Sequence, residues 1–278
     1  MQSKNIIFNS LRESFSIIWK NKLLFLSLFI LQIAFFVVFS AVNIKYQTKI
    51  LENTKAITDY LSQQKLDEAS ATDAILQQKN ILGDDPLMIS ENFDEIVKNF
   101  RLYLGYVFIL LIFFISIAWA ITYRLLKKTS LRQLTNIFLK NIVILLFYLG
   151  LIFTFFFLLL NVSITQLAEQ SSMLFAKYST FLIVSIILAY FMFISIAIAN
   201  HIKLKNIVQK TLSIGIRKAH YVLSVYFINI FLLFISMSLL YYFIEKNPFI
   251  LLLSLILFVF SFVFGRILII NVVEKLKA

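Results

Sequence analysis

Hydrophobic positions along the chain fall into six long runs that are separated by more polar segments. Each run has roughly the 17–25 residues that a helix needs to cross about 30 Å of hydrocarbon. Runs such as 153–160 (FTFFFLLL) lack the polar residue at every second position that is typical of a transmembrane barrel strand. Because hydrocarbon offers no partners for backbone polar groups, each run is expected to be helical. The predicted transmembrane helices are 23–44, 102–123, 141–162, 179–200, 221–244 and 249–270.

The composition supports this interpretation. Of the 278 residues, 60% are hydrophobic and 14% are charged, whereas soluble domains average about 25% charged residues. The run at 23–44 is longer than the apolar region of a cleaved signal peptide, which has about 7–15 residues, so it is expected to remain as a transmembrane helix. The sequence therefore predicts an all-α, polytopic membrane bundle with a single membrane domain over 1–278.

The distribution of charge predicts the orientation of this bundle. The segments on the side of both termini hold 17 Lys and Arg and 2 acidic residues, whereas the opposite side holds 9 Lys and Arg and 12 acidic residues. By the positive-inside rule, both termini are predicted to be cytoplasmic, in a multi-pass protein of the cell membrane. The net charge of +12 does not indicate a nucleic-acid partner, because the basic residues lie between apolar runs instead of forming one patch.

A short motif recurs before the first and third runs. The sequence SLRE at 10–13 is repeated as SLRQ at 130–133, and a Lys-Asn pair follows each copy at the same distance, at 20–21 and 140–141. Both copies are typical of a capping box, in which a Ser side chain and a Glu or Gln side chain satisfy backbone N–H groups at a helix start. A weaker third copy is formed by Asn206 and Gln209.

The segments 1–22, 124–140 and 201–220 are accordingly predicted to be basic amphipathic helices along the cytoplasmic leaflet, each preceding a transmembrane hairpin. The pattern also has a simpler explanation, since any short cytoplasmic connector must be basic and half apolar. A basic residue near an acidic leaflet gains about 1 kcal/mol, so anionic lipid head groups are expected partners. The candidate contacts to these head groups are Arg124, Lys127, Lys128, Arg217 and Lys218.

The segment 45–101 is the long connection on the opposite side. It greatly exceeds the median connection of about 4–6 residues, and such connections are usually functional or disordered. Ile50, Ile57 and Leu61 share a helical face, and a second apolar stripe runs from Phe93 into the next predicted span. A cap at Ser70 and a turn at 83–86 are expected between them. We therefore predict a helical protrusion, which either binds a protein partner or serves as a solvated spacer.

The residues that carry most enzyme chemistry are scarce. The chain has no Cys, and its two histidines, His201 and His220, lie at opposite ends of one basic segment. A zinc site needs three or four ligands, and hydrolysis by a side-chain nucleophile needs a base within hydrogen-bond reach. The sequence therefore predicts no catalytic residue, no metal site and no cofactor, and we expect that the protein is not an enzyme.

Polar side chains inside the spans are the remaining candidates. Gln32, Asn229 and Asn161 carry amides, which must pair across helices or line a wet cavity. Arg266 lies near the cytoplasmic end of the last span, where its side chain is expected to snorkel to the interface. The predicted spans contain no acidic residue and no Pro, and their single glycines do not form the Gly/Pro interruption that marks an unwound binding site, which disfavours an ion-coupled transporter.

The segment from Ser10 to Phe25, with its echo at 130–141, resembles uncharacterised prokaryotic families of six-span membrane proteins, many of them archaeal. In those families a basic amphipathic helix that ends in W-K-N precedes a span rich in Phe, Leu and Ile. The resemblance implies the six-span topology. It implies no activity or site residues, and it offers no counterpart to 45–101.

Three classes of function are compatible with these features. The sequence favours a non-enzymatic membrane scaffold or partner subunit. The alternative is a permease, channel or lipid transporter with a cavity near Gln32 and Asn229, and a continuous polar cavity between the helices would support it. A membrane enzyme that shares its site with another subunit is the third possibility.

Overall fold

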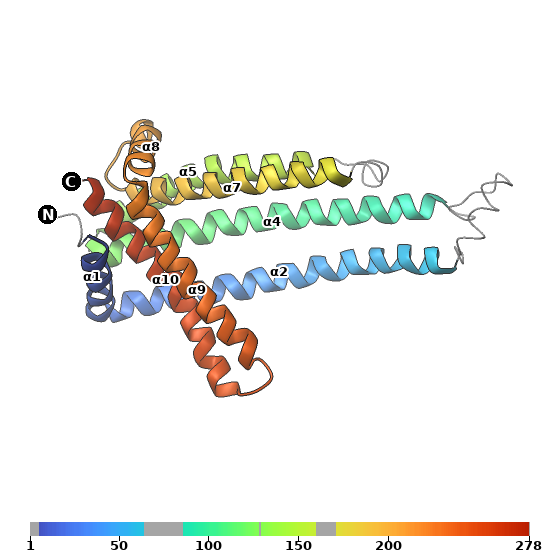
Figure 1. Cartoon of the computed structure of the whole chain (residues 1–278), viewed down its shortest axis with the longest axis horizontal. Helices are drawn as coiled ribbons and strands as arrows, with labels where there is room; N and C mark the ends of the chain where they lie inside the picture. Colours follow the sequence, from blue (N-terminus) through green and yellow to red (C-terminus); the bar gives the residue numbers. More distant parts are fainter. Residues whose placement is uncertain (1–5, 64–85, 128, 160–170, 278) are drawn as a thin grey trace. The chain divides into compact units, whose positions relative to one another are not determined.

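The computed structural model describes residues 6–63, 86–127, 129–159 and 171–277, and within these ranges the chain is helical and contains no strand (Figure 1). Two compact units are present, one formed by 1–36 with 111–278 and the other by 37–110. The helices are α1 (Ile6–Lys20), α2 (Lys22–Gln63), α4 (Pro86–Lys127), α5 (Leu131–Leu159), α7 (Ser171–Ile198), the short 3-10 helix η2 (Leu204–Asn206), α8 (Ile207–Arg217), α9 (Ala219–Phe243) and α10 (Pro248–Lys277).

Six of these helices, α2, α4, α5, α7, α9 and α10, are long and apolar enough to cross a membrane. They correspond to the six apolar runs, so the prediction of an all-α fold with six such helices is confirmed. Two of them continue well past the runs, since α2 reaches Gln63 and α4 begins at Pro86. The cap expected at Ser70 and the turn expected after Gly83 lie outside the described residues.

The capping box at 130–133 is confirmed. The backbone N–H of Gln133 donates to Ser130 Oγ at 3.4 Å, and the backbone N–H of Ser130 donates to Gln133 Oε1 at 3.2 Å. The box predicted at 10–13 is wrong, because α1 already begins at Ile6 and places Ser10 in the helix interior. Residues 6–9, upstream of the motif, are thus already part of α1. A helix does begin after Asn206, but the Asn206 side chain makes no capping hydrogen bond.

The middle connector differs from the expected arrangement. Separate short helices, α1 and α8, precede α2 and α9, whereas residues 131–140 are the first turns of α5. The polar pair Lys140-Asn141 therefore lies within a continuous helix. Lys140 Nζ donates to the carbonyls of Ala199 and Ile202 at 3.2 and 3.3 Å, and Asn141 Nδ2 donates to Ser116 O at 3.4 Å. Neighbouring elements thus accept from both side chains, whereas Asn141 Oδ1 is buried without a partner among the described residues.

The N-terminal helix α1 packs against the last helix within the first unit. Ser10 and Ser14 are fully buried, and Asn271 Nδ2 of α10 donates to Ser14 Oγ at 2.8 Å. Trp19, near the end of α1, is 75% exposed. The helix therefore presents its small polar residues to the protein and leaves much of its apolar surface outward, which suits a helix that lies in a lipid interface.

The core of the first unit lies where α2, α4 and α10 meet. Leu28, Leu125, Val263 and Ile267 form a buried cluster there. The neighbouring helices α9 and α10 form a hairpin (Figure 1). Asn247 ends the connection, since its Oδ1 accepts from two backbone N–H groups of the first turn of α10 at 3.0 and 3.2 Å. This cap holds the last two long helices together as neighbours.

The second unit contains the C-terminal part of α2 and the N-terminal part of α4. Tyr46 of α2 is buried, and its ring centroid lies 5.7 Å from that of Tyr106 and 6.2 Å from that of Tyr103, both of α4. Within this unit, α2 and α4 thus contact each other through tyrosine rings.

Candidate functional site

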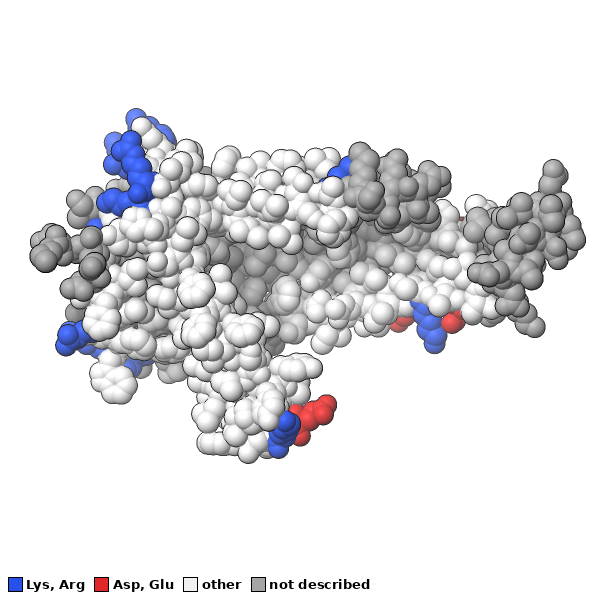
Figure 2. Space-filling model, viewed as in Figure 1, with Lys and Arg blue, Asp and Glu red and all other residues white. Residues whose placement is uncertain are grey.

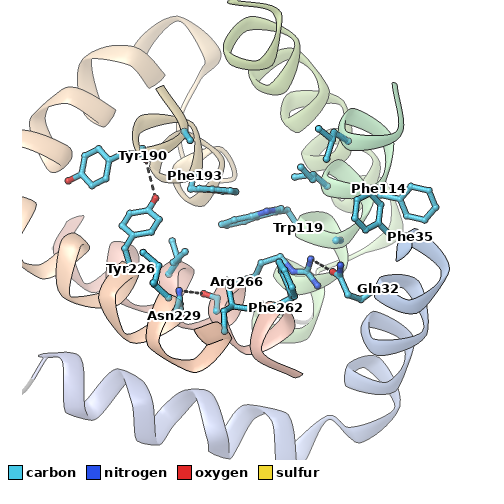
Figure 3. A pocket seen from close by; sticks show the side chains of 18 of the residues that line it. Gln32, Phe35, Phe114, Trp119, Tyr190, Phe193, Tyr226, Asn229, Phe262 and Arg266 are labelled. Carbon is cyan, nitrogen blue, oxygen red and sulfur yellow. Dashed lines mark hydrogen bonds between the residues drawn. The ribbon is translucent and has the colours of Figure 1, made fainter. Parts of the chain in front are cut away.

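A cavity of about 600 Å³ lies inside the first unit, among α2, α4, α7, α9 and α10 (Figure 3). Figure 2 shows the surface hollowed between α7 and the α9–α10 hairpin. The cavity volume falls within the range of about 300–1,000 Å³ that is usual for small-molecule sites. Its wall is formed by Leu31, Gln32, Phe35, Leu111, Phe114, Ile115, Ala118, Trp119, Ile186, Ala189, Tyr190, Phe193, Leu223, Tyr226, Asn229, Ile230, Leu233, Phe262, Gly265, Arg266 and Ile269.

Aromatic side chains make one wall of this cavity. The rings of Trp119 and Phe193 are stacked, with their centroids 6.1 Å apart, and Phe193 also contacts Tyr226 at 6.3 Å. Tyr226 Oη donates to Tyr190 O at 3.1 Å, and Tyr190 Oη donates to Gly215 O at 2.8 Å. These hydrogen bonds occupy the hydroxyl groups, so the rings present mainly apolar surface to the cavity.

Arg266 is the one charged residue of the wall. Its Nη1 donates to Gln32 Oε1 at 2.9 Å, which joins α10 to α2 across the cavity wall (Figure 3). Its Nε and Nη2 atoms are buried and have no hydrogen-bond partner among the residues that the structure describes. The guanidinium is therefore only partly satisfied by the protein.

Asn229 is the third polar residue of the wall. Its Nδ2 donates to Gly265 O at 3.5 Å, and its Oδ1 is buried without a partner in the described part of the chain. Gly265 allows this close approach, because a Cβ at that position would lie 3.1 Å from the Asn229 amide. The absence of a side chain at Gly265 thus allows the Asn229 amide to lie next to the residue that precedes Arg266.

The three polar residues lie at similar positions along their helices. Gln32 and Asn229 are each about 15 Å from the first residue of α2 and of α9, and Arg266 is about 16 Å from the last residue of α10, at 1.5 Å per residue. This distance is about half of a 30 Å hydrocarbon layer. If the long helices span a bilayer, the polar part of the cavity wall lies near its middle.

Two of the amides predicted from the sequence come together at this cavity. Gln32 and Asn229 are both buried and both belong to its wall. Asn161 lies outside the described residues. Sequence reasoning missed Arg266, whose side chain was expected to reach the interface and instead bonds to Gln32. One signal could have identified Arg266. It lies about as far from the end of its helix as Gln32 and Asn229 lie from the starts of theirs.

The candidate lipid contacts take different places. Arg124 is half-buried in α4, and Arg217 is exposed in the last turn of α8. Lys127 Nζ pairs with Glu274 Oε1 at 2.9 Å, and Lys218 Nζ donates to the carbonyl of Leu276. Lys128 lies outside the described residues. Figure 2 shows basic side chains over α8 and around α1, without acidic ones there on the visible face.

The described residues do not bring three or more His, Cys, Asp or Glu side chains together in a group that could hold a metal ion. Comparison of the chain with protein-family models, with curated proteins and with solved structures found no match. The cavity is therefore the feature on which a functional proposal can rest, and its chemistry is that of an apolar container with a cationic group in its wall.

Proposed function

We propose that this protein is a membrane protein of the permease or lipid-transporter class, and that it binds a lipid-like molecule in the cavity of its first unit. The observation that carries this proposal is the cavity of about 600 Å³ lined by apolar side chains. A scaffold needs no such space between its helices, so the cavity favours the alternative function over the scaffold that the sequence favoured.

The chemistry of the wall supports a lipid-like ligand over a polar solute. A permease for polar solutes, or a channel, needs a continuous polar surface that replaces the hydration shell of its cargo. Here the polar residues Gln32, Asn229 and Arg266 are confined to one part of a wall that is otherwise hydrophobic or aromatic. An acyl chain requires no hydrogen bonds, and each methylene group transferred from water gains about 0.8 kcal/mol.

The volume supports the same class of ligand. A water molecule takes about 30 Å³ in the liquid, so 600 Å³ has room for roughly twenty groups of that size. A single acyl chain of about 16–18 carbons with a small head group meets this limit. A complete two-chain phospholipid exceeds it.

Tryptophan fluorescence tests the proposal directly. The chain has two tryptophans, Trp19 and Trp119; Trp119 lines the cavity and is 1% exposed, whereas Trp19 is 75% exposed. In a Trp19→Phe variant in nanodiscs, a long-chain alkyl ester with a nitroxide at its far end should quench Trp119 with saturation. In a Trp119→Phe variant, the quenching of Trp19 should rise linearly with probe, as for simple partitioning.

A substitution that fills the cavity provides a second test of the same proposal. Ala189→Phe places a ring in the cavity and should abolish the saturable quenching of Trp119. Val184→Phe adds a similar group to the opposite, exposed face of the same helix and should leave it unchanged. Linear quenching of Trp119, unaffected by Ala189→Phe, would refute the proposal.

We also propose that the six long helices span the cell membrane with both termini in the cytoplasm. The excess of basic residues on the side of the termini supports this orientation. Because the chain lacks cysteine, single cysteines can be labelled in intact cells by an impermeant maleimide. Cysteine at Asp59, which is exposed on α2, should react, whereas cysteine at Lys210, which is exposed on α8, should react only after lysis. The reverse pattern would overturn the orientation.

A further inference from the structure

The guanidinium of Arg266 has one satisfied nitrogen and two unsatisfied ones, and the identity of these nitrogens matters. Nη1 donates to Gln32 Oε1 at 2.9 Å. Nε and Nη2, which have no partner among the described residues, are the two nitrogens whose N–H groups point in parallel from one edge of the guanidinium. That edge is the fork that binds the two oxygens of a carboxylate or a phosphate. The unsatisfied part of Arg266 therefore offers two parallel donors to an anion, and because both atoms are buried, neighbouring side chains must move aside for the anion to reach them.

The charge of Arg266 is not balanced by a nearby acid of the protein. The ion pairs in the described part of the chain involve Glu13, Glu95 and Glu274, and none of them includes Arg266. Gln32 supplies an acceptor oxygen but no negative charge. Since a charged Arg at the centre of a membrane helix is costly, an anion that enters the cavity would offset a desolvation cost that the free protein already bears.

The arrangement of polar and aromatic residues in the cavity wall restricts which anion can bind. The charged group and the amides of Gln32 and Asn229 lie together on α10, α2 and α9, and the aromatic surface of Trp119 and Phe193 faces them from the other helices (Figure 3). A ligand that satisfies both parts of the wall must carry its charge at one end and an apolar chain at the other.

We infer that the cavity selects a single-chain anionic amphiphile, whose carboxylate or phosphate head group pairs with the Nε and Nη2 edge of Arg266 while its acyl chain packs on the aromatic wall. This inference rests on the proposed function, because it names the class of ligand for the same cavity. Gln32 is a positioning residue: by accepting from Nη1, it leaves the two-donor edge for the ligand.

The test compares head groups on one chain in the Trp19→Phe protein. The probes are a long-chain fatty acid with a nitroxide at the far end, its methyl ester, and a lysophosphatidate with the same labelled chain, all at alkaline pH, where the carboxylate is ionised. Both anions should saturate the quenching of Trp119 at concentrations about ten- to hundredfold lower than the ester, because each anion carries a negative charge and can accept from both donors, whereas the ester is neutral. The ratio between the two anions then identifies the preferred head group.

Variants at one position separate charge from structure. Arg266→Gln should remove the preference, so that the anions and the methyl ester saturate the quenching at similar concentrations in this variant. Arg266→Lys keeps the charge but loses the fork, so it should retain only part of the preference. The head-group comparison in the unsubstituted cavity stands even if Arg266→Gln fails to fold.

The outcomes distinguish the inference from the proposal beneath it. Saturable quenching by all three probes with equal affinity would overturn the inference and leave the proposed function intact. An anion preference that survives in Arg266→Gln would also overturn the inference. The absence of saturable quenching with any probe would instead refute the proposed function.

Discussion

The hydrogen bond between Gln32 and Arg266 allows a prediction about stability without ligand. Three variants dissect it: Gln32→Leu, Arg266→Met and the double variant, each of which replaces a polar side chain with an apolar one of similar length. Gln32→Leu removes a hydrogen bond to a charged group, so it should lower the free energy of unfolding by about 1.5–3 kcal/mol. The remaining guanidinium would have lost the acceptor that the protein provides for Nη1.

In Arg266→Met, two opposing effects on the free energy of unfolding must be added. Arg266→Met removes a central charge that costs about 2.5–3.5 kcal/mol on insertion scales. It also removes the hydrogen bond and leaves the buried Gln32 amide without this partner, which costs about 1–3 kcal/mol. These terms nearly cancel, so the single variant should match the parent protein closely. The double variant also removes the unsatisfied amide. Its free energy of unfolding should exceed that of the parent protein by about 1–4 kcal/mol, because apolar replacements of buried ionic groups often stabilise a protein.

Equilibrium unfolding in mixed detergent micelles, followed by far-ultraviolet circular dichroism after extensive delipidation, measures the four stabilities. Delipidation matters, because a bound ligand would raise the stability of the parent alone. Leu252→Met, at an exposed position of α10, is the control and should change the stability by less than about 0.5 kcal/mol. A double variant less stable than the parent would show that Arg266 is a structural residue whose charge the protein itself satisfies, and it would refute the reasoning.

Two further predictions concern packing and helix starts. At Gly215, a Cβ would lie 2.7 Å from Phe191 Cε1, so Gly215→Ala should lower the unfolding midpoint by an amount equivalent to about 1–3 kcal/mol. Gly150→Ala, whose Cβ meets no atom within 4 Å, should instead raise stability by about 0.5–1 kcal/mol; equal effects would contradict the packing described. Ser130→Ala removes a confirmed cap and should cost about 0.5–2 kcal/mol in the same unfolding assay. Ser10→Ala removes a buried hydroxyl without a partner in the described residues and should be neutral or stabilising, so a loss there as large as at Ser130 would argue against a position of Ser10 inside α1.

The six long helices were predictable because each depends on local sequence alone. A run of apolar residues must satisfy its backbone internally, whatever lies beside it. The start of α5 was predictable for the same reason, since Ser130 and Gln133 interact within one turn. The position of Ser10 inside α1 was not, because α1 already includes residues 6–9 upstream of the motif and Ser10 is buried, which depends on the packing of this helix.

The cavity could be predicted only in part. Gln32 and Asn229 were candidates because an amide in hydrocarbon needs a partner, and both belong to the cavity wall. The partner of Gln32 could not be read from periodicity, because the contact with Arg266 depends on which faces of α2 and α10 meet. The volume and the aromatic wall have the same origin, since five helices contribute and no short motif specifies their arrangement.

The cavity joins the first long helix to the last one, and this has a consequence for biogenesis. Gln32 and Arg266 are 234 residues apart, and Ser14 and Asn271 are 257 apart. At about 5–20 residues per second, the ribosome needs roughly 10–50 s to make the chain between Gln32 and Arg266. During that interval, the amide of Gln32 must find hydrogen-bond partners other than Arg266. The cavity is thus completed only when α10 has been synthesised, after the other long helices.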